Sequence, residues 1–135
     1  MGRGSVPVKL GFAIVMLSAA CATAANGGAL PVHEGTCVWT KISRVEQRLQ
    51  DGEHGPFVAG SGSAVELANG GYQVSYEEIP EVNHSRKGDR VLMCLVALPR
   101  HCPPGDNRGK IYTTTNLRTM ESWTLPDAEH MCGGA

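Results

Sequence analysis

The positions of Cys37, Cys94, Cys102 and Cys132 constrain the fold of this chain more than any other feature of its sequence. Four cysteines are an even number, and the segment that precedes them has the features of an export signal. In an oxidising compartment such a set predicts two disulfides, for which three pairings are possible. The spacing favours Cys94–Cys102, which closes a short loop that contains Pro99, together with Cys37–Cys132, which ties the ends of the domain together. The other two pairings remain open.

Residues 1–24 are predicted to be a secretory signal peptide. The segment begins with a basic stretch without acids, continues through the apolar run 10–22 and ends in the small residues Ala22-Thr23-Ala24. The run is shorter than the roughly 20 residues that a membrane-spanning helix needs. We therefore expect cleavage after Ala24, with Ala22 as an alternative site, and a periplasmic or secreted mature chain without a membrane span.

Cys21 offers a second interpretation of the same segment. Leu17 lies four residues ahead of it, one residue further than the leucine of a bacterial lipobox. Lipid anchoring at Cys21 is therefore an alternative to simple cleavage, and an uncleaved membrane anchor is a third.

The size and charge of the chain exclude several classes of protein. Its 135 residues correspond to one domain, and 17 glycines with 8 prolines indicate a turn-rich fold whose small core needs covalent support. Beyond residue 24 the chain keeps 10 Lys and Arg against 13 Asp and Glu, a net charge of −3. This charge argues against a nucleic-acid partner, because binding to phosphates needs a basic surface.

Alternation of polar and apolar residues predicts a hairpin over 63–77. Two alternating runs flank Asn69-Gly70, and Asn-Gly favours a tight hairpin turn because both residues accept positive φ. Earlier in the chain, 36–46 is rich in strand-favouring residues and predicts a strand. A helix is the rival there, because the apolar residues also fit helical spacing.

Later segments complete a predicted all-β domain over 36–135, preceded by a flexible arm at 25–35. The run 90–98 is apolar on both faces, which predicts a central strand covered on both sides. Strands at 110–115 and 120–125 follow. Five to six short strands predict a small antiparallel barrel or sandwich, stapled by two disulfides. The expected core consists of Trp39, Val65, Leu67, Tyr72, Val74, Tyr76, Leu92, Val96, Ile111, Trp123 and Leu125.

The loop 100–109 is the most distinctive candidate for a binding surface. Prolines and a disulfide would hold it in one shape, and a pre-ordered loop loses little entropy on binding. Arg100, Asp106 and Arg108 would then present charges at fixed positions. A purely structural interpretation is a turn in which Asp106 binds its own backbone.

Arg118 and Trp123 extend this candidate face into the adjacent region 116–130. Trp123 suits either the core or a ligand platform. Arg118 is expected to form an ion pair with Asp127.

Two histidines make metal binding an alternative function. His101 precedes Cys102, and His130 lies two residues before Cys132, so imidazole and sulfur ligands for zinc or copper are close in sequence. The spacing differs from common zinc motifs, and oxidation would consume the thiols. We therefore expect no cofactor.

The motifs of common enzymes are missing. The segment 60–64, Gly-Ser-Gly-Ser-Ala, lacks the third glycine of a dinucleotide loop, and neither G-x-S-x-G nor a P-loop lysine occurs. We therefore expect no enzymatic activity and assign no catalytic residue.

Three segments, 60–76, 85–109 and 115–135, carry a resemblance to small exported proteins of bacteria without an assigned activity. This resemblance implies export and an all-β fold. Residues 60–72 are similar to the small barrel inhibitors of lysozyme found in bacterial envelopes, which implies an inhibitor of a cell-wall hydrolase as another alternative. The function expected from the sequence is an exported, non-enzymatic binding or structural module of the bacterial cell envelope. Its partner would be an envelope or extracellular protein or a glycan.

Overall fold

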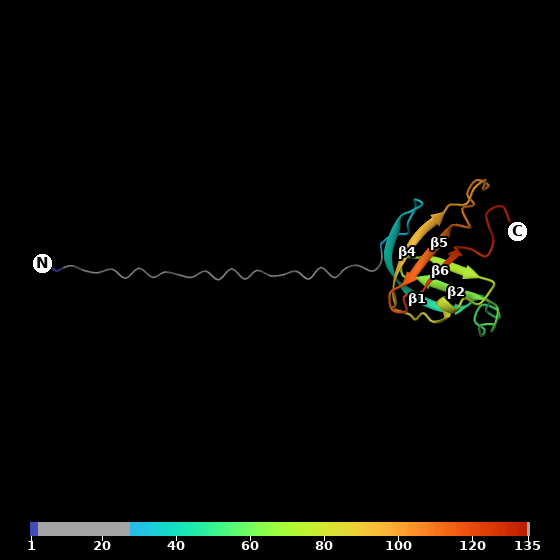
Figure 1. Cartoon of the computed structure of the whole chain (residues 1–135), viewed down its shortest axis with the longest axis horizontal. Coiled ribbons are helices and arrows are strands. Elements are labelled where there is room, and N and C mark those ends of the chain that lie inside the picture. The colour runs from blue at the N-terminus through green and yellow to red at the C-terminus, as the bar shows by residue number, and fades with distance from the viewer. Residues whose placement is uncertain (3–27, 135) are drawn as a thin grey trace.

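The computed structural model describes residues 1–2 and 28–134, so Cys21 and almost all of the predicted signal segment lie outside the described residues. The domain is one six-stranded antiparallel sheet in the order β3-β2-β1-β4-β5-β6, which curls into a half-barrel (Figure 1). This confirms the predicted all-β fold. The elements are β1 Cys37–Gln47, β2 Ser63–Leu67, β3 Tyr72–Ser75, α1 Pro80–Asn83, β4 Arg90–Ala97, β5 Ile111–Asn116 and β6 Ser122–Pro126.

Strand β1 connects the two halves of the sheet. Its first half pairs with β4 and its second half pairs with β2, and the register shifts between Ile42 and Arg44. Such an irregularity bends a strand and increases its twist, so the sheet turns at this point. The prediction of a strand rather than a helix at 36–46 is confirmed.

The hairpin around Asn69-Gly70 is confirmed, with β2 and β3 as its arms. Gly70 adopts positive φ, at 84°, whereas Asn69 does not. Asn69 instead accepts a hydrogen bond from the backbone N–H of Gly71 through its side-chain oxygen, at 3.1 Å. The expectation of positive φ is therefore met by Gly70 alone, and Leu67 N donates to Gly71 O at 2.8 Å across the turn.

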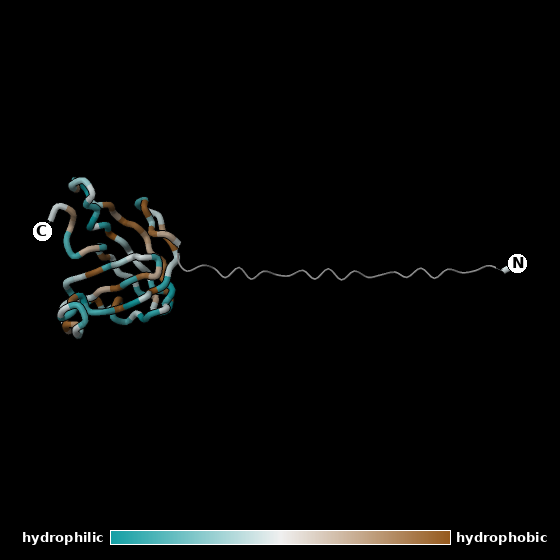
Figure 2. The backbone as a smooth tube through the Cα atoms, turned by 180° about the vertical axis from the view of Figure 1, so that it is seen from behind, coloured by the Kyte–Doolittle hydropathy of each residue, from teal (hydrophilic) through white to brown (hydrophobic). Residues whose placement is uncertain are grey.

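The core lies on the concave side of the sheet. Figure 2 shows hydrophobic and hydrophilic stretches alternating along the chain of the folded domain. Val91, Met93 and Leu95 of β4 are fully buried there. The opposite side of β4 is open, since Val96 is 49% exposed and Leu92 is only partly buried. The prediction that this strand is covered on both sides is therefore wrong. Three expected core residues are exposed, namely Trp39, Tyr76 and Val96.

The edge strands β3 and β6 approach each other through the side chain of Gln73, which is fully buried. Its amide N–H donates to the backbone oxygen of Tyr112 at 2.8 Å. Its amide oxygen accepts from Thr114 Oγ1 at 2.6 Å and from Trp123 Nε1 at 3.0 Å. One side chain therefore links the two open edges where no backbone ladder joins them.

The described part of the expected flexible arm, residues 28–35, is attached to the sheet. The backbone N–H of Gly28 donates to Trp39 O at 3.2 Å, and Leu30 packs against the core. The carboxylate of Glu34 accepts from the backbone N–H of Leu98 at 2.8 Å. Over these residues the expectation of a loose arm does not hold.

The disulfides are Cys37–Cys94 and Cys102–Cys132, with Cα separations of 4.0 and 5.3 Å. The pairing favoured by the sequence spacing is wrong, because the register of β1 and β4 places Cys37 directly opposite Cys94. Two disulfides in so small a domain indicate an oxidising, extracellular-type environment. Within the described residues, no helix has the length and apolar character needed to cross a bilayer.

Candidate binding face

The convex side of β1, β4, β5 and β6 carries side chains in rows that cross the strands. In one row Trp39 lies opposite Leu92, Leu92 opposite Thr115, and Thr115 opposite Ser122. Trp39 is 49% exposed, although a tryptophan is usually well buried. The hydroxyls of Thr115 and Ser122 are hydrogen-bonded at 2.8 Å. The row therefore combines an open aromatic surface with ordered hydroxyl groups.

A second row runs beside the first. It contains the Cys37–Cys94 disulfide, then Thr113 and Thr124, whose hydroxyls are 2.7 Å apart. The disulfide joins β1 to β4 on this side of the sheet and limits movement between the strands that carry Trp39 and its neighbours.

Lys41 and Arg90 form a third pair, directly opposite each other on β1 and β4. The backbone N–H of Ile42 donates to Asp89 O at 3.0 Å, so residues 42 and 89 are a hydrogen-bonded pair. In an antiparallel ladder the next pair, Lys41 and Arg90, is then of the non-hydrogen-bonded type, in which side chains are closest. The guanidinium of Arg90 also lies 5.6 Å from the centre of a Trp39 ring, within the range of a cation–π contact.

The cations of the domain fall into two groups. Five of the ten Lys and Arg residues between 28 and 134 form ion pairs: Arg44, Arg48, Arg108, Lys110 and Arg118. The other five have no carboxylate oxygen within 4.0 Å among the described residues: Lys41, Arg86, Lys87, Arg90 and Arg100.

Four of these five unpaired cations gather at one place. The turn that contains Arg86 and Lys87 is held against β1, because Gly88 N donates to Ile42 O at 2.8 Å. This turn leads into Arg90, beside Lys41. We define the outer face as the two rows, the Lys41–Arg90 pair and this basic turn. Its residues are Trp39, Leu92, Thr115, Ser122, Cys37, Cys94, Thr113, Thr124, Lys41, Arg90, Arg86 and Lys87.

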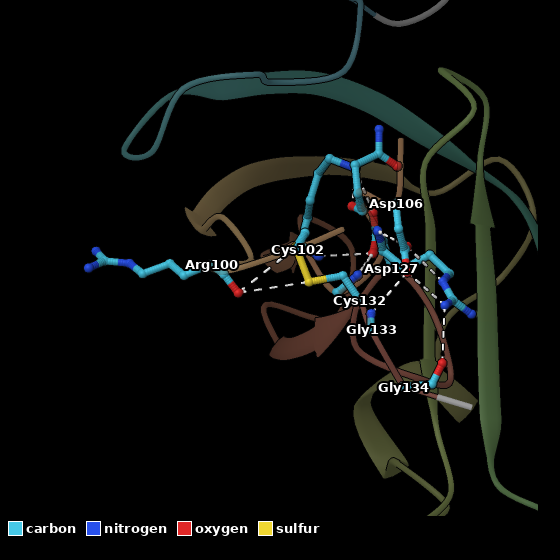
Figure 3. The surroundings of a disulfide bond; sticks show 11 residues. Arg100, Cys102, Asp106, Asp127, Cys132, Gly133 and Gly134 are labelled. Atoms are coloured by element: carbon cyan, nitrogen blue, oxygen red, sulfur yellow. Dashed lines mark hydrogen bonds and ion pairs between the residues drawn. A yellow bond between two sulfur atoms is a disulfide. The ribbon is translucent and has the colours of Figure 1, made fainter. Parts of the chain in front are cut away.

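The loop 98–110 and the C-terminal tail form a separate corner stapled by Cys102–Cys132 (Figure 3). Asp106 accepts hydrogen bonds from Arg108 Nε at 2.9 Å and from the backbone N–H of Gly133 at 3.0 Å. The Arg108 contact holds the pKa of Asp106 well below its usual range. Both predicted binding residues are thus engaged within the corner itself.

Asp127 has a similar role at the base of the corner. Its carboxylate accepts from the backbone N–H groups of Gly109 and Lys110, at 2.7 and 2.9 Å, and pairs with Lys110 Nζ at 3.3 Å. Arg100 differs from these residues, because its side chain extends away from the disulfide in Figure 3. Of the charges predicted in this loop, Arg100 alone forms no ion pair with any described residue.

Arg118 lies at the opposite end of β5 from this corner, in the turn that joins β5 to β6. It makes a bidentate contact with Asp89, at 2.8 and 2.9 Å, and donates to His84 O at 2.7 Å. The Arg118 hydrogen bonds lower the pKa of Asp89 to about 2. The predicted pair of Arg118 with Asp127 is therefore wrong.

Trp123 is only 4% exposed and belongs to the core. Its indole faces Gln73, as described above, and cannot serve as a ligand platform. The five predicted binding residues therefore do not form one surface: three lie in the stapled corner, Arg118 lies at the other end of the sheet, and Trp123 is buried.

The metal-binding alternative loses its sulfur ligands, because all four cysteines beyond residue 28 are in disulfides. Over residues 28–134 there is no group of three or more His, Cys, Asp or Glu side chains placed to hold a metal ion. His130 lies beside Tyr76, with ring centres 6.4 Å apart.

A shallow hollow of about 460 Å³ is lined by residues that include His84, Arg118 and Glu121. Most of its charged groups have partners, since Arg118 is held by Asp89 and His84 Nδ1 lies 3.1 Å from Glu121. Among its charged lining residues, Arg86 alone has no carboxylate partner within the described residues. It therefore offers less unused binding capacity than the outer face.

No protein-family model, curated protein or solved structure matches the chain. The candidate site therefore depends on the geometry of this domain alone. Sequence reasoning missed Lys41 and Arg90 because they are far apart in the chain and become neighbours only through the register of β1 and β4.

Proposed function

We propose that this chain is a non-enzymatic binding module, exported through a cleaved signal peptide to the periplasm or beyond, and that it binds its partner through the outer face. The observation that carries the proposal is the exposure of Trp39 within a row of ordered side chains. Exposed tryptophan on a rigid surface is enriched in binding sites, because its large ring gains much from burial by a partner and loses little entropy.

The contrast with the stapled corner supports this choice of face. The charges of Asp106, Arg108 and Asp127 are compensated within the corner, so a partner would have to break existing contacts to use them. On the outer face the cations have no carboxylate partner within the described residues, and the indole of Trp39 stays half exposed beside Arg90. The outer-face residues also include no histidine, carboxylate or free thiol, which fits binding rather than catalysis.

Export can be tested by the intact mass of the protein from the exported fraction, with and without alkylation in the absence of reductant. The proposal expects a chain that begins near Ala25 and has four fewer hydrogens than the reduced form. It also expects no alkylation. A chain that keeps residues 1–24, or one that carries lipid on Cys21, would contradict the cleaved signal.

Binding can be tested by pelleting the mature protein with bacterial envelope fragments. Trp39→Ala should abolish pelleting, because it removes the central aromatic surface. Phe57→Ala is the matched control, since Phe57 is 42% exposed on the 48–62 loop outside the outer face. If the Trp39→Ala protein pelleted with the fragments as much as the wild type does, the assignment of the outer face as the binding surface would be contradicted.

A further inference from the structure

We infer that the ligand of the outer face is an acidic glycan, held by Lys41 and Arg90 through its anionic groups and by Trp39 through the apolar side of a sugar ring. This inference rests on the proposed function, since it names the ligand of the same face.

The charge of the face is the first argument. Lys41 and Arg90 are directly opposite in a non-hydrogen-bonded pair, an arrangement of like charges that disfavours the folded sheet. Within the described residues no carboxylate neutralises them, although the mature chain is acidic overall. Elsewhere in the domain exposed cations such as Arg44 do have acidic partners. An anion placed between Lys41 and Arg90 would relieve their repulsion.

The chemistry around the cations is the second argument. Trp39 neighbours Arg90, and the same row continues into the hydroxyls of Thr115 and Ser122. A sugar ring has C–H groups that pack on an indole and hydroxyls that bond to serine and threonine. An acidic glycan therefore matches all three kinds of group on the face: the ring, the cations and the hydroxyls.

The shape and polarity of the face favour a glycan over a lipid surface. A face that inserts into the acyl region of a membrane would have to desolvate the hydroxyls of Thr113, Thr115, Ser122 and Thr124, at a cost in free energy. A sugar polymer leaves them hydrated or hydrogen-bonded. The convex side of a curled sheet also suits an extended polymer better than a small molecule, which needs a concave site.

The test measures binding of the mature wild-type protein to alginate, which carries carboxylates, to dextran sulfate, and to neutral dextran, by affinity electrophoresis and calorimetry. We expect binding to at least one acidic polymer and not to neutral dextran. Lys41→Gln and Arg90→Gln should each weaken this binding by about tenfold, because each removes one charged contact. Arg100→Gln, which removes the unpaired cation at the stapled corner, should bind like the wild type.

Several outcomes would contradict the glycan ligand or the proposed face. Equal binding to neutral dextran, binding to neither acidic polymer, or an equal loss with Arg100→Gln would overturn the inference. If the protein bound phosphatidylglycerol vesicles more tightly than both polymers, with the same dependence on Lys41 and Arg90, the ligand would be an anionic lipid surface and the glycan inference would be wrong. If no polymer binds but Trp39→Ala still abolishes envelope pelleting, only the glycan inference fails. If Trp39→Ala pellets normally, the proposed face itself is wrong.

Discussion

Trp123 on β6 donates its indole N–H to the side-chain oxygen of Gln73 on β3, 3.0 Å away, across the open seam of the half-barrel. The same oxygen accepts from Thr114, and the amide N–H of Gln73 donates to Tyr112 O. Because the side chains of Trp123 and Thr114 are buried, each of these two donors depends on Gln73 for its hydrogen bond. Gln73 thus takes the place of a sixth strand pairing, the one that would join β3 to β6.

Gln73→Leu should destabilise the domain by about 3 kcal/mol, because it leaves the Trp123 and Thr114 donors and the Tyr112 carbonyl buried without this partner. Urea unfolding followed by tryptophan fluorescence would measure the change. Gln50→Leu is the matched control, since Gln50 is exposed and its side-chain amide donates to Gly55 O on the surface. Similar losses in the two variants would show that the seam does not depend on Gln73.

Asp89 should make the domain sensitive to acid. Its carboxylate is only 8% exposed and its pKa is about 2, lowered from 3.8 chiefly by the hydrogen bonds of Arg118. Since the folded pKa lies below the unfolded one, ionised Asp89 stabilises the fold above pH 3.8, and this contribution is lost as the pH falls towards 2. We expect about 2 kcal/mol of unfolding free energy to be lost over this range.

Unfolding of Asp89→Asn as a function of pH would check this expectation. The variant should be less stable than the wild type near neutral pH and should lose less of its stability on acidification. Asp51→Asn serves as a control, because Asp51 forms no ion pair among the described residues. Parallel acid profiles for the wild type and Asp89→Asn would rule out Asp89 as the group responsible.

Residue type and alternation predict single elements of this domain, whereas the pairing of distant strands depends on contacts that are not local in sequence. The hairpin at 63–77 and the strand at 36–46 follow from alternation and residue type, which are local properties, and both are confirmed. Register is not local. The sequence cannot show that Cys37 faces Cys94, so the favoured disulfide pairing was wrong.

The two tryptophans show the same limit. Both lie in strands, and only the twist and pairing of the sheet decide which side chain meets the core. The sequence predicts both in the core. Trp123 points inward, which confirms that assignment and rules out its alternative role as a ligand platform, whereas Trp39 points outward. The outer face therefore could not be predicted from the sequence, because its residues are brought together by the register of the paired strands.

The double variant Cys102→Ser/Cys132→Ser should lose stability but keep binding, because the stapled corner stabilises the domain and the outer face binds the partner. The bridge spans 30 residues, and its loss should cost about 3 kcal/mol through the gain in unfolded-chain entropy. Envelope pelleting should nevertheless persist, because no outer-face residue lies in the corner. Thermal unfolding would report the first effect and the pelleting assay the second. If the double variant folded but no longer pelleted, the binding surface would have to include the stapled corner rather than the outer face alone.

Lys41→Glu should raise stability while it abolishes binding. The substitution places a carboxylate directly opposite Arg90, where the wild type has two like charges. A favourable cross-strand pair then replaces a repulsive one, and we expect a gain of about 0.5 kcal/mol in urea unfolding at low salt. The same carboxylate would occupy the place of the ligand's anion and repel it, so binding to acidic polymers should disappear. Arg100→Glu, with the same change in net charge, should keep binding and show no comparable gain in stability. A Lys41→Glu protein that is less stable, or one that still binds, would show that the opposed cations are not held for an anionic ligand.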